Sequence, residues 1–218
     1  MLKRKPPNRN KAPMTNQIED VPPIVLASQS PRRRALLEDL GIPFIQMPSN
    51  VDESRLDGEL PRDFARRAAF EKGEDIRGRL EKEGKSPWIV SADTIVVLGD
   101  EVFFKPKNKA EARVMTARLS GRTHTVITGW AVIRSGIAPR VSHTETAVTF
   151  HRLTEAQIDG YVETGEGLDK AGAYAVQGIG TFLVEKIDGN YFNVVGLPVS
   201  HVVRALLEAG ALPRYPLR

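Results

Sequence analysis

Residues Ser28–Arg34 place two hydroxyls, a proline and three arginines where an apolar segment gives way to a helical pattern. The free N–H groups and positive dipole end of a helix start favour an anion, and guanidinium groups match phosphate oxygens with paired hydrogen bonds. A capped surface helix with solvated arginines would show the same residues. The chain contains no Walker phosphate loop, and Leu183 occupies the third glycine's place after Gly178 and Gly180, which excludes a dinucleotide fingerprint.

Asp93 lies inside the apolar segment 89–97. An unpaired carboxylate buried there would be costly, so the side chain is expected to face a partner or to lie at a strand end. Metal coordination or general-base catalysis would explain it. A strand carboxylate that faces solvent or pairs with a lysine is the alternative.

Further charged residues are candidates for the same chemistry. Magnesium typically uses one or two carboxylates and fills its other positions with water and phosphate oxygens, and nearby lysines would neutralise charge that develops on phosphates. Each of these residues taken alone is typical of a surface charge. They indicate a site only if the folded chain brings their side chains together. They are Asp52, Glu53, Lys72, Lys105 and Lys170.

Several other chemistries are excluded by composition and spacing. The chain has no cysteine, which excludes disulfides, thiolate zinc sites and a cysteine nucleophile. The four histidines show no metal-ligand spacing and are interpreted as structural or surface residues. No G-x-S-x-G nucleophile elbow occurs, so covalent serine catalysis has no support.

The first half of the chain alternates strand and helix patterns. A strand at 24–27 leads into a helix with Ser30 as N-cap, Pro31 at its first position and Gly41 as a left-handed C-terminal cap. A strand at 42–48 and a helix at 61–83 follow. Two glycines in that helix favour a break or fraying there; they are Gly73 and Gly78.

Hairpin patterns dominate the rest of the chain. The predicted elements are strands at 88–97, 101–104, 123–134, 140–151 and 181–187, and helices at 109–119, 154–162 and 200–208, the helix near 154 opening with a Thr154–Gln157 capping box. This order predicts an α/β fold with a long mixed, twisted sheet flanked by helices, bent into two lobes around a cleft.

The basic charge is concentrated at the N-terminus. Residues 1–20 carry +3 of the net +4, in a Pro- and Asn-containing stretch that can bury little apolar surface. We therefore expect a disordered basic extension at 1–20 and a single domain at 21–218, and the charge distribution argues against a nucleic-acid partner. No apolar run reaches the length that crosses a bilayer and no signal-peptide pattern is present, so no membrane partner and a cytoplasmic location are expected.

Ten blocks in order resemble the Maf family and cover about residues 24–207. They are Leu26–Arg33, Asp52-Glu53, Glu71-Lys72, Ala92–Thr94, Lys105-Pro106, Leu119–His124, Thr128-Gly129, Asp169–Tyr174, Gln177-Gly178 and Asn193–Pro198. The resemblance implies a fold similar to inosine triphosphatases, a homodimer, and a metal-dependent nucleoside triphosphate pyrophosphatase that releases the monophosphate and pyrophosphate.

The resemblance also implies residue roles. Asp93 would accept the proton of the attacking water, and Glu53 with Asp93 would hold a divalent metal, Mg or Mn. Lys72 and Lys105 would assist catalysis at the phosphates. The substrate-binding set would be Ser28, Ser30, Arg32, Arg33, Thr94, Lys170 and Gln177.

The choice of base is implied by three of these positions. The chain resembles the dTTP/UTP branch at Arg32, Thr94 and Gln177, whereas a 7-methyl-GTP branch differs in the Gln177 block and lacks the arginine. An amide donor and acceptor at Gln177 suit the O4/N3 edge of uracil or thymine. Ala175-Val176 departs from the family's usual Gly-Ile, and the N-terminal extension has no counterpart in its pattern.

Two rival functions stay open from the sequence. One is a nucleotide- or nucleic-acid-binding module without catalysis, which would be indifferent to Asp93→Asn. The other is a related pyrophosphatase acting on 7-methyl-GTP or on deaminated purine triphosphates.

Overall fold

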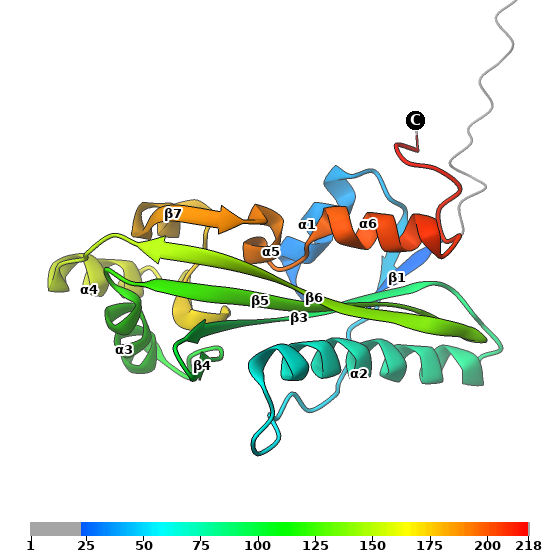
Figure 1. The fold of residues 1–218 in the computed structure, drawn as a ribbon, viewed down its shortest axis with the longest axis horizontal. Coiled ribbons are helices and arrows are strands. Elements are labelled where there is room, and N and C mark those ends of the chain that lie inside the picture. Colours follow the sequence, from blue (N-terminus) through cyan, green and yellow to red (C-terminus); the bar gives the residue numbers. More distant parts are fainter. Residues whose placement is uncertain (1–22, 218) are drawn as a thin grey trace, which may run out of the picture.

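The computed structural model describes residues 23–217, so the extension predicted at 1–20 lies outside the described residues. One seven-stranded sheet in the order β2-β1-β3-β5-β6-β7, with β4 also paired to β3, runs along the long axis of the molecule (Figure 1). Its strands are β1 (Ile24–Leu26), β2 (Phe44–Gln46), β3 (Ile89–Leu98), β4 (Glu101–Phe103), β5 (Thr123–Arg134), β6 (Ile137–Phe150) and β7 (Val184–Gly189). The helices are α1 (Pro31–Asp39), α2 (Pro61–Lys82), α3 (Lys109–Leu119), α4 (Glu155–Glu163), α5 (Tyr191–Val195) and α6 (Val199–Glu208), with 3-10 segments η1 (Ala171–Ala173) and η2 (Gly178–Leu183).

The sheet is mixed, as predicted. β1 is parallel to both β2 and β3, while β3, β5, β6 and β7 pair antiparallel in sequence order. Strand–helix alternation at the start of the chain builds the parallel part, because parallel neighbours need a crossover, and hairpins build the rest. The long mixed sheet flanked by helices is therefore confirmed.

Along one edge of β3 the sheet divides into two branches, β1 and β4, and we call this opening the fork. On one side β3 pairs with β5 from Ile89 to Val97. On the other side it pairs with β1 only as far as Val90, and with β4 only from Val96. Residues 91–95 therefore have no strand neighbour on that side, and the opening lies beyond the carboxyl end of β1, where α/β sheets commonly bind ligands.

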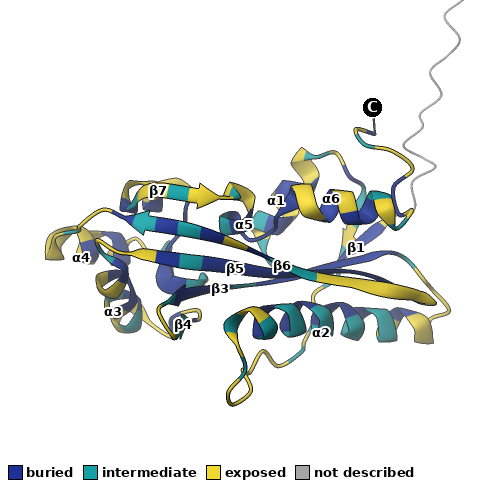
Figure 2. Cartoon of the chain, viewed as in Figure 1, coloured by how far each residue is buried: buried dark blue, intermediate teal, exposed yellow. Residues whose placement is uncertain are grey.

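Helices cover both faces of the sheet. α2 lies along one face and buries Phe64, Ile76 and Leu80 against it, while its outer side faces solvent (Figure 2). α1, α5 and α6 lie on the opposite face, and α3 and α4 lie at one end of the molecule (Figure 1). Among the described residues, no helix is both long and apolar enough to cross a bilayer.

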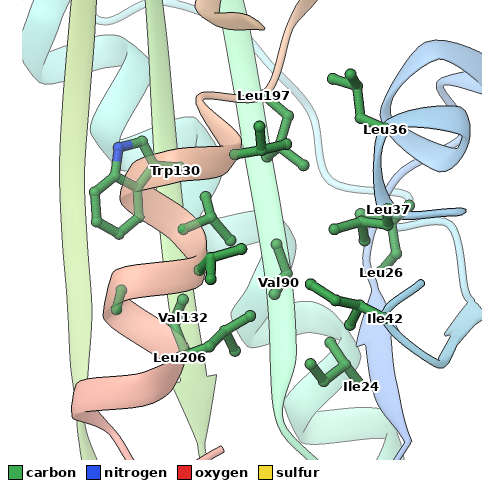
Figure 3. Packing of buried hydrophobic residues seen from close by; sticks show 14 of the residues in the cluster. Ile24, Leu26, Leu36, Leu37, Ile42, Val90, Trp130, Val132, Leu197 and Leu206 are labelled. Atoms are coloured by element: carbon green, nitrogen blue, oxygen red, sulfur yellow. The ribbon is translucent and has the colours of Figure 1, made fainter. Parts of the chain in front are cut away.

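The face opposite α2 carries two apolar clusters, one on each side of the fork. The first joins α1 and α6 to β1 and the beginning of β3, and includes Leu26, Leu37, Val90 and Leu206 (Figure 3). The second joins α3 and α4 to the end of β3 through Val96 and to β4. The two clusters correspond to the two lobes expected around a cleft.

The first helix begins and ends where the sequence predicts. Ser30 is the N-cap, and its Oγ accepts the N–H of Arg33 at 3.4 Å. Gly41, just beyond the helix, has φ +66°, which glycine adopts without strain. The capping box of Thr154 with Gln157 and the whole of α3 are also as predicted.

The break or fraying expected in the 61–83 helix is wrong, because α2 runs unbroken through Gly73 and Gly78. A Cβ on Gly73 would lie 2.5 Å from Ile133 Cδ1 and 2.8 Å from Ser91 Oγ. This glycine lets the helix approach the sheet closely, so it reflects packing and not a helix end.

The end of the chain departs from prediction in two further places. The strand predicted at 181–187 starts only at Val184, since residues 178–183 form η2. The short helix α5 has no counterpart among the predicted elements; Asn190 caps it by accepting the N–H of Asn193 at 3.1 Å.

Candidate active site

A cleft of about 600 Å³ opens at the fork in the sheet. Its walls come from the β1–α1 turn, the loop before α2, the middle of β3 and the segments around η1 and α5. All eleven residues predicted for the site line it: Ser28, Ser30, Arg32, Arg33, Glu53, Lys72, Asp93, Thr94, Lys105, Lys170 and Gln177.

One end of the cleft holds two carboxylates bridged by a lysine. Lys72, in the middle of α2, places its Nζ 2.6 Å from Asp93 Oδ1 and 2.8 Å from Glu53 Oε1. The lysine and Asp93 side chains are 11% and 8% exposed, so this pair is largely shielded from solvent. Glu53 is 46% exposed, so solvent reaches its carboxylate far more than that of Asp93.

Asp93 is held ionised by its surroundings. Burial alone favours the neutral acid, but the Lys72 ammonium, with a smaller contribution from Arg33, outweighs it and keeps the pKa of Asp93 below its ordinary value. A carboxylate that is charged at neutral pH suits the binding of a cation or the acceptance of a proton.

The two carboxylates at the Lys72 end of the cleft fit a divalent metal that takes most of its ligands from water and substrate oxygens. Glu53 and Asp93 approach the same ammonium, so their oxygens point at one volume that suits a positive charge. The described residues hold no group of three or more His, Cys, Asp or Glu suited to a metal. Two carboxylates are sufficient for magnesium, which rarely uses an all-protein cage.

Arg33 is a buried organising residue of the cleft. Its Nε donates to Gly196 O at 2.7 Å, its Nη1 to Ser28 Oγ at 3.1 Å and Ala92 O at 2.8 Å, and its Nη2 to Thr94 Oγ1 at 3.0 Å. The Ala92 carbonyl lies on the forked edge of β3, so the guanidinium takes the place of the missing strand there. Most of the donors of Arg33 are thus used inside the protein.

A polar chain continues from Thr94 into the core. Thr94 and Thr128 share a hydrogen bond of 2.9 Å between their hydroxyls, and Thr128 Oγ1 donates to Asn193 O at 3.0 Å. Asn193 Nδ2 in turn donates to Val126 O and Thr146 Oγ1, both at 3.0 Å. This chain ties α5 and the Gly196 turn to β3, and no spacing pattern in the sequence singles it out.

The other end of the cleft is basic. Arg32 Nη1 lies 3.4 Å from Asp169 Oδ2, and Lys170 Nζ lies 2.5 Å from Asp169 Oδ1. Lys105 has no hydrogen-bond or ion-pair partner among the described residues and is exposed. These cations leave donors available toward the cleft, which suits the charged oxygens of a phosphate chain.

Gln177 lies on the same wall, at the start of η2. Its side chain is exposed and has no hydrogen-bond partner in the described part of the chain. Both the donor and the acceptor of the amide are therefore available to a ligand.

A family model described as Maf-like protein matches residues 23–209. The chain belongs to the Maf family. It is 47% identical over 178 residues to a protein of Thermoanaerobacter sp. (strain X514) named dTTP/UTP pyrophosphatase, covering 81% of this chain and 91% of that one. Proteins with the same name from Symbiobacterium thermophilum and Moorella thermoacetica are 44% and 48% identical, covering 89% and 86% of this chain and 95% of each relative.

The fold has a solved counterpart. A structure described as a HAM1 protein from Coxiella burnetii aligns over 85% of this Maf-family chain and 98% of its own length, with a TM-score of 0.50 and 16% sequence identity. At that identity the likeness concerns the α/β fold alone, and it agrees with the architecture expected from the sequence.

Two acidic residues of the Maf cleft region are missing from the site candidates that the sequence suggests. Asp169 joins Arg32 to Lys170, and its pKa is lowered because the Lys170 ammonium outweighs the opposing effect of burial. Glu166 accepts backbone N–H groups of η2, next to Gln177. Asp169 opens one of the blocks that resemble the Maf family, which was a signal for it, whereas Glu166 had only its proximity to Lys170 in the sequence.

Proposed function

We propose that this chain hydrolyses dTTP and UTP to the corresponding monophosphate and pyrophosphate. Relatives that are 44–48% identical over most of the chain carry the name of that activity. The supporting observation in the cleft is the Glu53–Lys72–Asp93 group at one end, with Arg32, Lys105 and Lys170 along the walls. Charge neutralisation, positioning and an activated water are what in-line displacement at phosphorus requires.

The reaction assigned to Asp93 is proton acceptance from water. As the water oxygen bonds to the α-phosphorus, the bridging bond between that phosphorus and the β-phosphate oxygen breaks, and pyrophosphate leaves with its electron pair. The proton passes to an Asp93 carboxylate oxygen and then to solvent. Lys72, at 2.6 Å, holds that carboxylate in place and keeps it ionised.

Glu53 and Asp93 are the residues proposed to hold a divalent metal, Mg or Mn. Such an ion lowers the pKa of water and neutralises charge on phosphate oxygens, which compensates for the weak basicity of a carboxylate with a lowered pKa. Lys72 lies between the two carboxylates in this structure, and its ammonium holds them together.

The triphosphate is proposed to lie along the basic wall. Arg32, Lys105 and Lys170 are the cations with donors left for phosphate oxygens, while the turn holding Ser28 and Ser30 lies at the positive dipole end of α1. Arg33 is proposed to support this turn more than to bind substrate, since it already donates to four protein oxygens.

The base is proposed to meet Gln177, whose amide is free to pair with the O4/N3 edge of uracil or thymine. Thr94 shapes the pocket through its bond to Arg33. The homodimer implied by the family and a cytoplasmic location stay predictions. Analytical ultracentrifugation of the full chain tests the first, and fractionation of the source cells tests the second.

The experiment measures pyrophosphate release from dTTP, UTP, CTP, 7-methyl-GTP and ITP, with and without Mg²⁺ or Mn²⁺, for the wild type and Asp93→Asn. We expect metal-dependent cleavage of dTTP and UTP that falls roughly 10²–10⁴-fold in the variant. Cleavage of 7-methyl-GTP or ITP in place of these would keep the chemistry and refute the role of Gln177. Absence of cleavage for every nucleotide would favour a binding module.

A further inference from the structure

Gln177 lies in a segment that is fixed to the protein on both sides. On its N-terminal side, Ala175 N donates to the Tyr161 hydroxyl at 3.0 Å. On its C-terminal side, the N–H groups of Ile179 and Gly180 donate to the Glu166 carboxylate at 2.9 and 2.7 Å. The glutamine itself makes no contact of this kind, so its place in the cleft depends on these anchors.

The Glu166 carboxylate uses both of its oxygens for this purpose. Oε1 accepts from Ile179 and Oε2 accepts from Gly180. Gly178, between Gln177 and these donors, has φ +71°, and a Cβ there would lie 2.2 Å from Glu166 Oε1. The carboxylate therefore fits tightly against a left-handed turn that immediately follows Gln177.

Tyr161 completes the support from α4. Its side chain is 2% exposed. Burial raises the pKa of Tyr161, and the neighbouring Glu166 carboxylate adds to the increase, so the hydroxyl stays protonated where it accepts from Ala175. Tyr161 and Glu166 thus hold the Gln177 segment from its two sides.

The side chain of Glu166 is separate from the basic wall of the cleft. Lys170 Nζ donates to the main-chain carbonyl of Glu166, and this bond does not depend on the carboxylate. A substitution that changes only the carboxylate should consequently alter the turn around Gln177 and leave Lys170 in place on the basic wall.

We propose that Glu166 and Tyr161 are positioning residues for base selection, which fix the turn around Gln177 so that its amide meets the pyrimidine edge of dTTP and UTP. This inference rests on the proposed function and adds to it a specificity role for residues outside the cleft lining. Neither residue is assigned contact with substrate.

The decisive variant is Glu166→Gln. It keeps the size of the side chain but replaces one acceptor oxygen with an NH₂ group, which then faces a backbone N–H. We expect the KM for dTTP to rise about tenfold, the size expected for loss of one charge-assisted hydrogen bond, with kcat changed less than about twofold. The ratio of kcat/KM for dTTP over CTP should fall by a similar factor.

A double-mutant cycle with Gln177→Ala distinguishes positioning from general structural damage. If Glu166 acts through Gln177, adding Glu166→Gln to Gln177→Ala should produce no further loss of the dTTP-over-CTP ratio. Glu163→Gln, on an exposed carboxylate at the end of α4 and three residues before Glu166, is the matched control and should leave both kinetic constants unchanged.

Three results would overturn the inference: an unchanged dTTP-over-CTP ratio in Glu166→Gln, losses that add fully in the double variant, or a fall in kcat with constant KM. If Glu166→Gln fails to fold, Tyr161→Phe in the same cycle tests the inference by the same three criteria, because it removes only the hydroxyl that accepts from Ala175. A wild type that prefers no pyrimidine triphosphate would refute the proposed function instead, which separates the two failures.

Discussion

The Nζ of Lys72 lies 2.6 Å from Oδ1 of Asp93, joining the middle of α2 to the forked edge of β3 across 21 residues of sequence. Both side chains are largely buried, and the same ammonium reaches Glu53. The pair determines the charge at this end of the cleft. Without Lys72, the carboxylates of Asp93 and Glu53 would face the same volume with far less positive charge to balance them.

Replacing this lysine should change the pH dependence of activity. The pKa of Asp93 in the folded protein is lowered chiefly by Lys72, against the effect of burial. Asp93 therefore stays charged until the pH falls through that lowered value. In Lys72→Met the pKa of Asp93 should rise, so the acid limb of the kcat/KM profile should move to higher pH, and the maximum of that profile should be lower.

A pH profile of pyrophosphate release from dTTP measures both effects. Lys107→Met, which alters an exposed lysine outside the cleft, is the control, and coincident acid limbs in Lys72→Met and this control would contradict the argument.

Arg33 should be necessary for the stability of the cleft. Arg33→Lys keeps the charge but cannot reach Gly196 O, Ala92 O and Thr94 Oγ1 together. We expect a loss of about 2–4 kcal/mol in the free energy of unfolding, since buried acceptors lose charged donors. Urea unfolding measures this loss. The adjacent Arg34→Lys removes only an exposed contact with Glu38 and should change stability little, so equal losses in the two variants would count against the role of Arg33.

Two glycines of α2 should respond oppositely to alanine. Helix propensity alone predicts that Gly→Ala stabilises either position by roughly 0.5–1 kcal/mol. At Gly78 a Cβ meets nothing within 4 Å, so Gly78→Ala should be stabilising. At Gly73 a Cβ would press on Ile133, which is 1% exposed and cannot move aside, so Gly73→Ala should be destabilising by about 1–3 kcal/mol. Thermal unfolding of the two variants decides the matter, and a stabilised Gly73→Ala would show that the helix can shift away from the sheet.

His124 should make stability depend on pH in mildly acidic solution. Burial lowers the pKa of His124 from 6.5 to about 4, and its Nε2 lies 2.8 Å from the Tyr174 hydroxyl. Between these values the unfolded chain binds a proton that the folded chain does not, so stability is lost as the pH falls from 6.5 toward 4 and is constant above 6.5 with respect to this group. The slope approaches about 1.4 kcal/mol per pH unit. Urea unfolding across this range should show a shallower slope in His124→Gln, and parallel slopes would refute the assignment.

Local structure and the members of the site could be predicted from the amino-acid sequence. Ser30, Pro31 and Gly41 fixed the limits of α1 through capping and φ preferences, which depend on neighbours in the chain. The residues of the cleft were predicted from chemical type and from resemblance to the Maf blocks, and all eleven lie together.

How these residues are used depends on the folded chain. Successive residues of a strand point to opposite faces, so Asp93 and Thr94 can line one cleft only because β1 and β4 leave the edge of β3 open between them. That opening depends on strand register, which neither residue encodes locally. Helix propensity depends on the local sequence, so it predicted a break or fraying at Gly73. The close packing of Gly73 against Ile133 involves residues 60 positions apart and is seen only in the folded chain. Likewise, only the tertiary structure shows that Arg33, expected to bind phosphate, makes mostly internal hydrogen bonds, because three of its four acceptors come from two distant segments, β3 and the Gly196 turn.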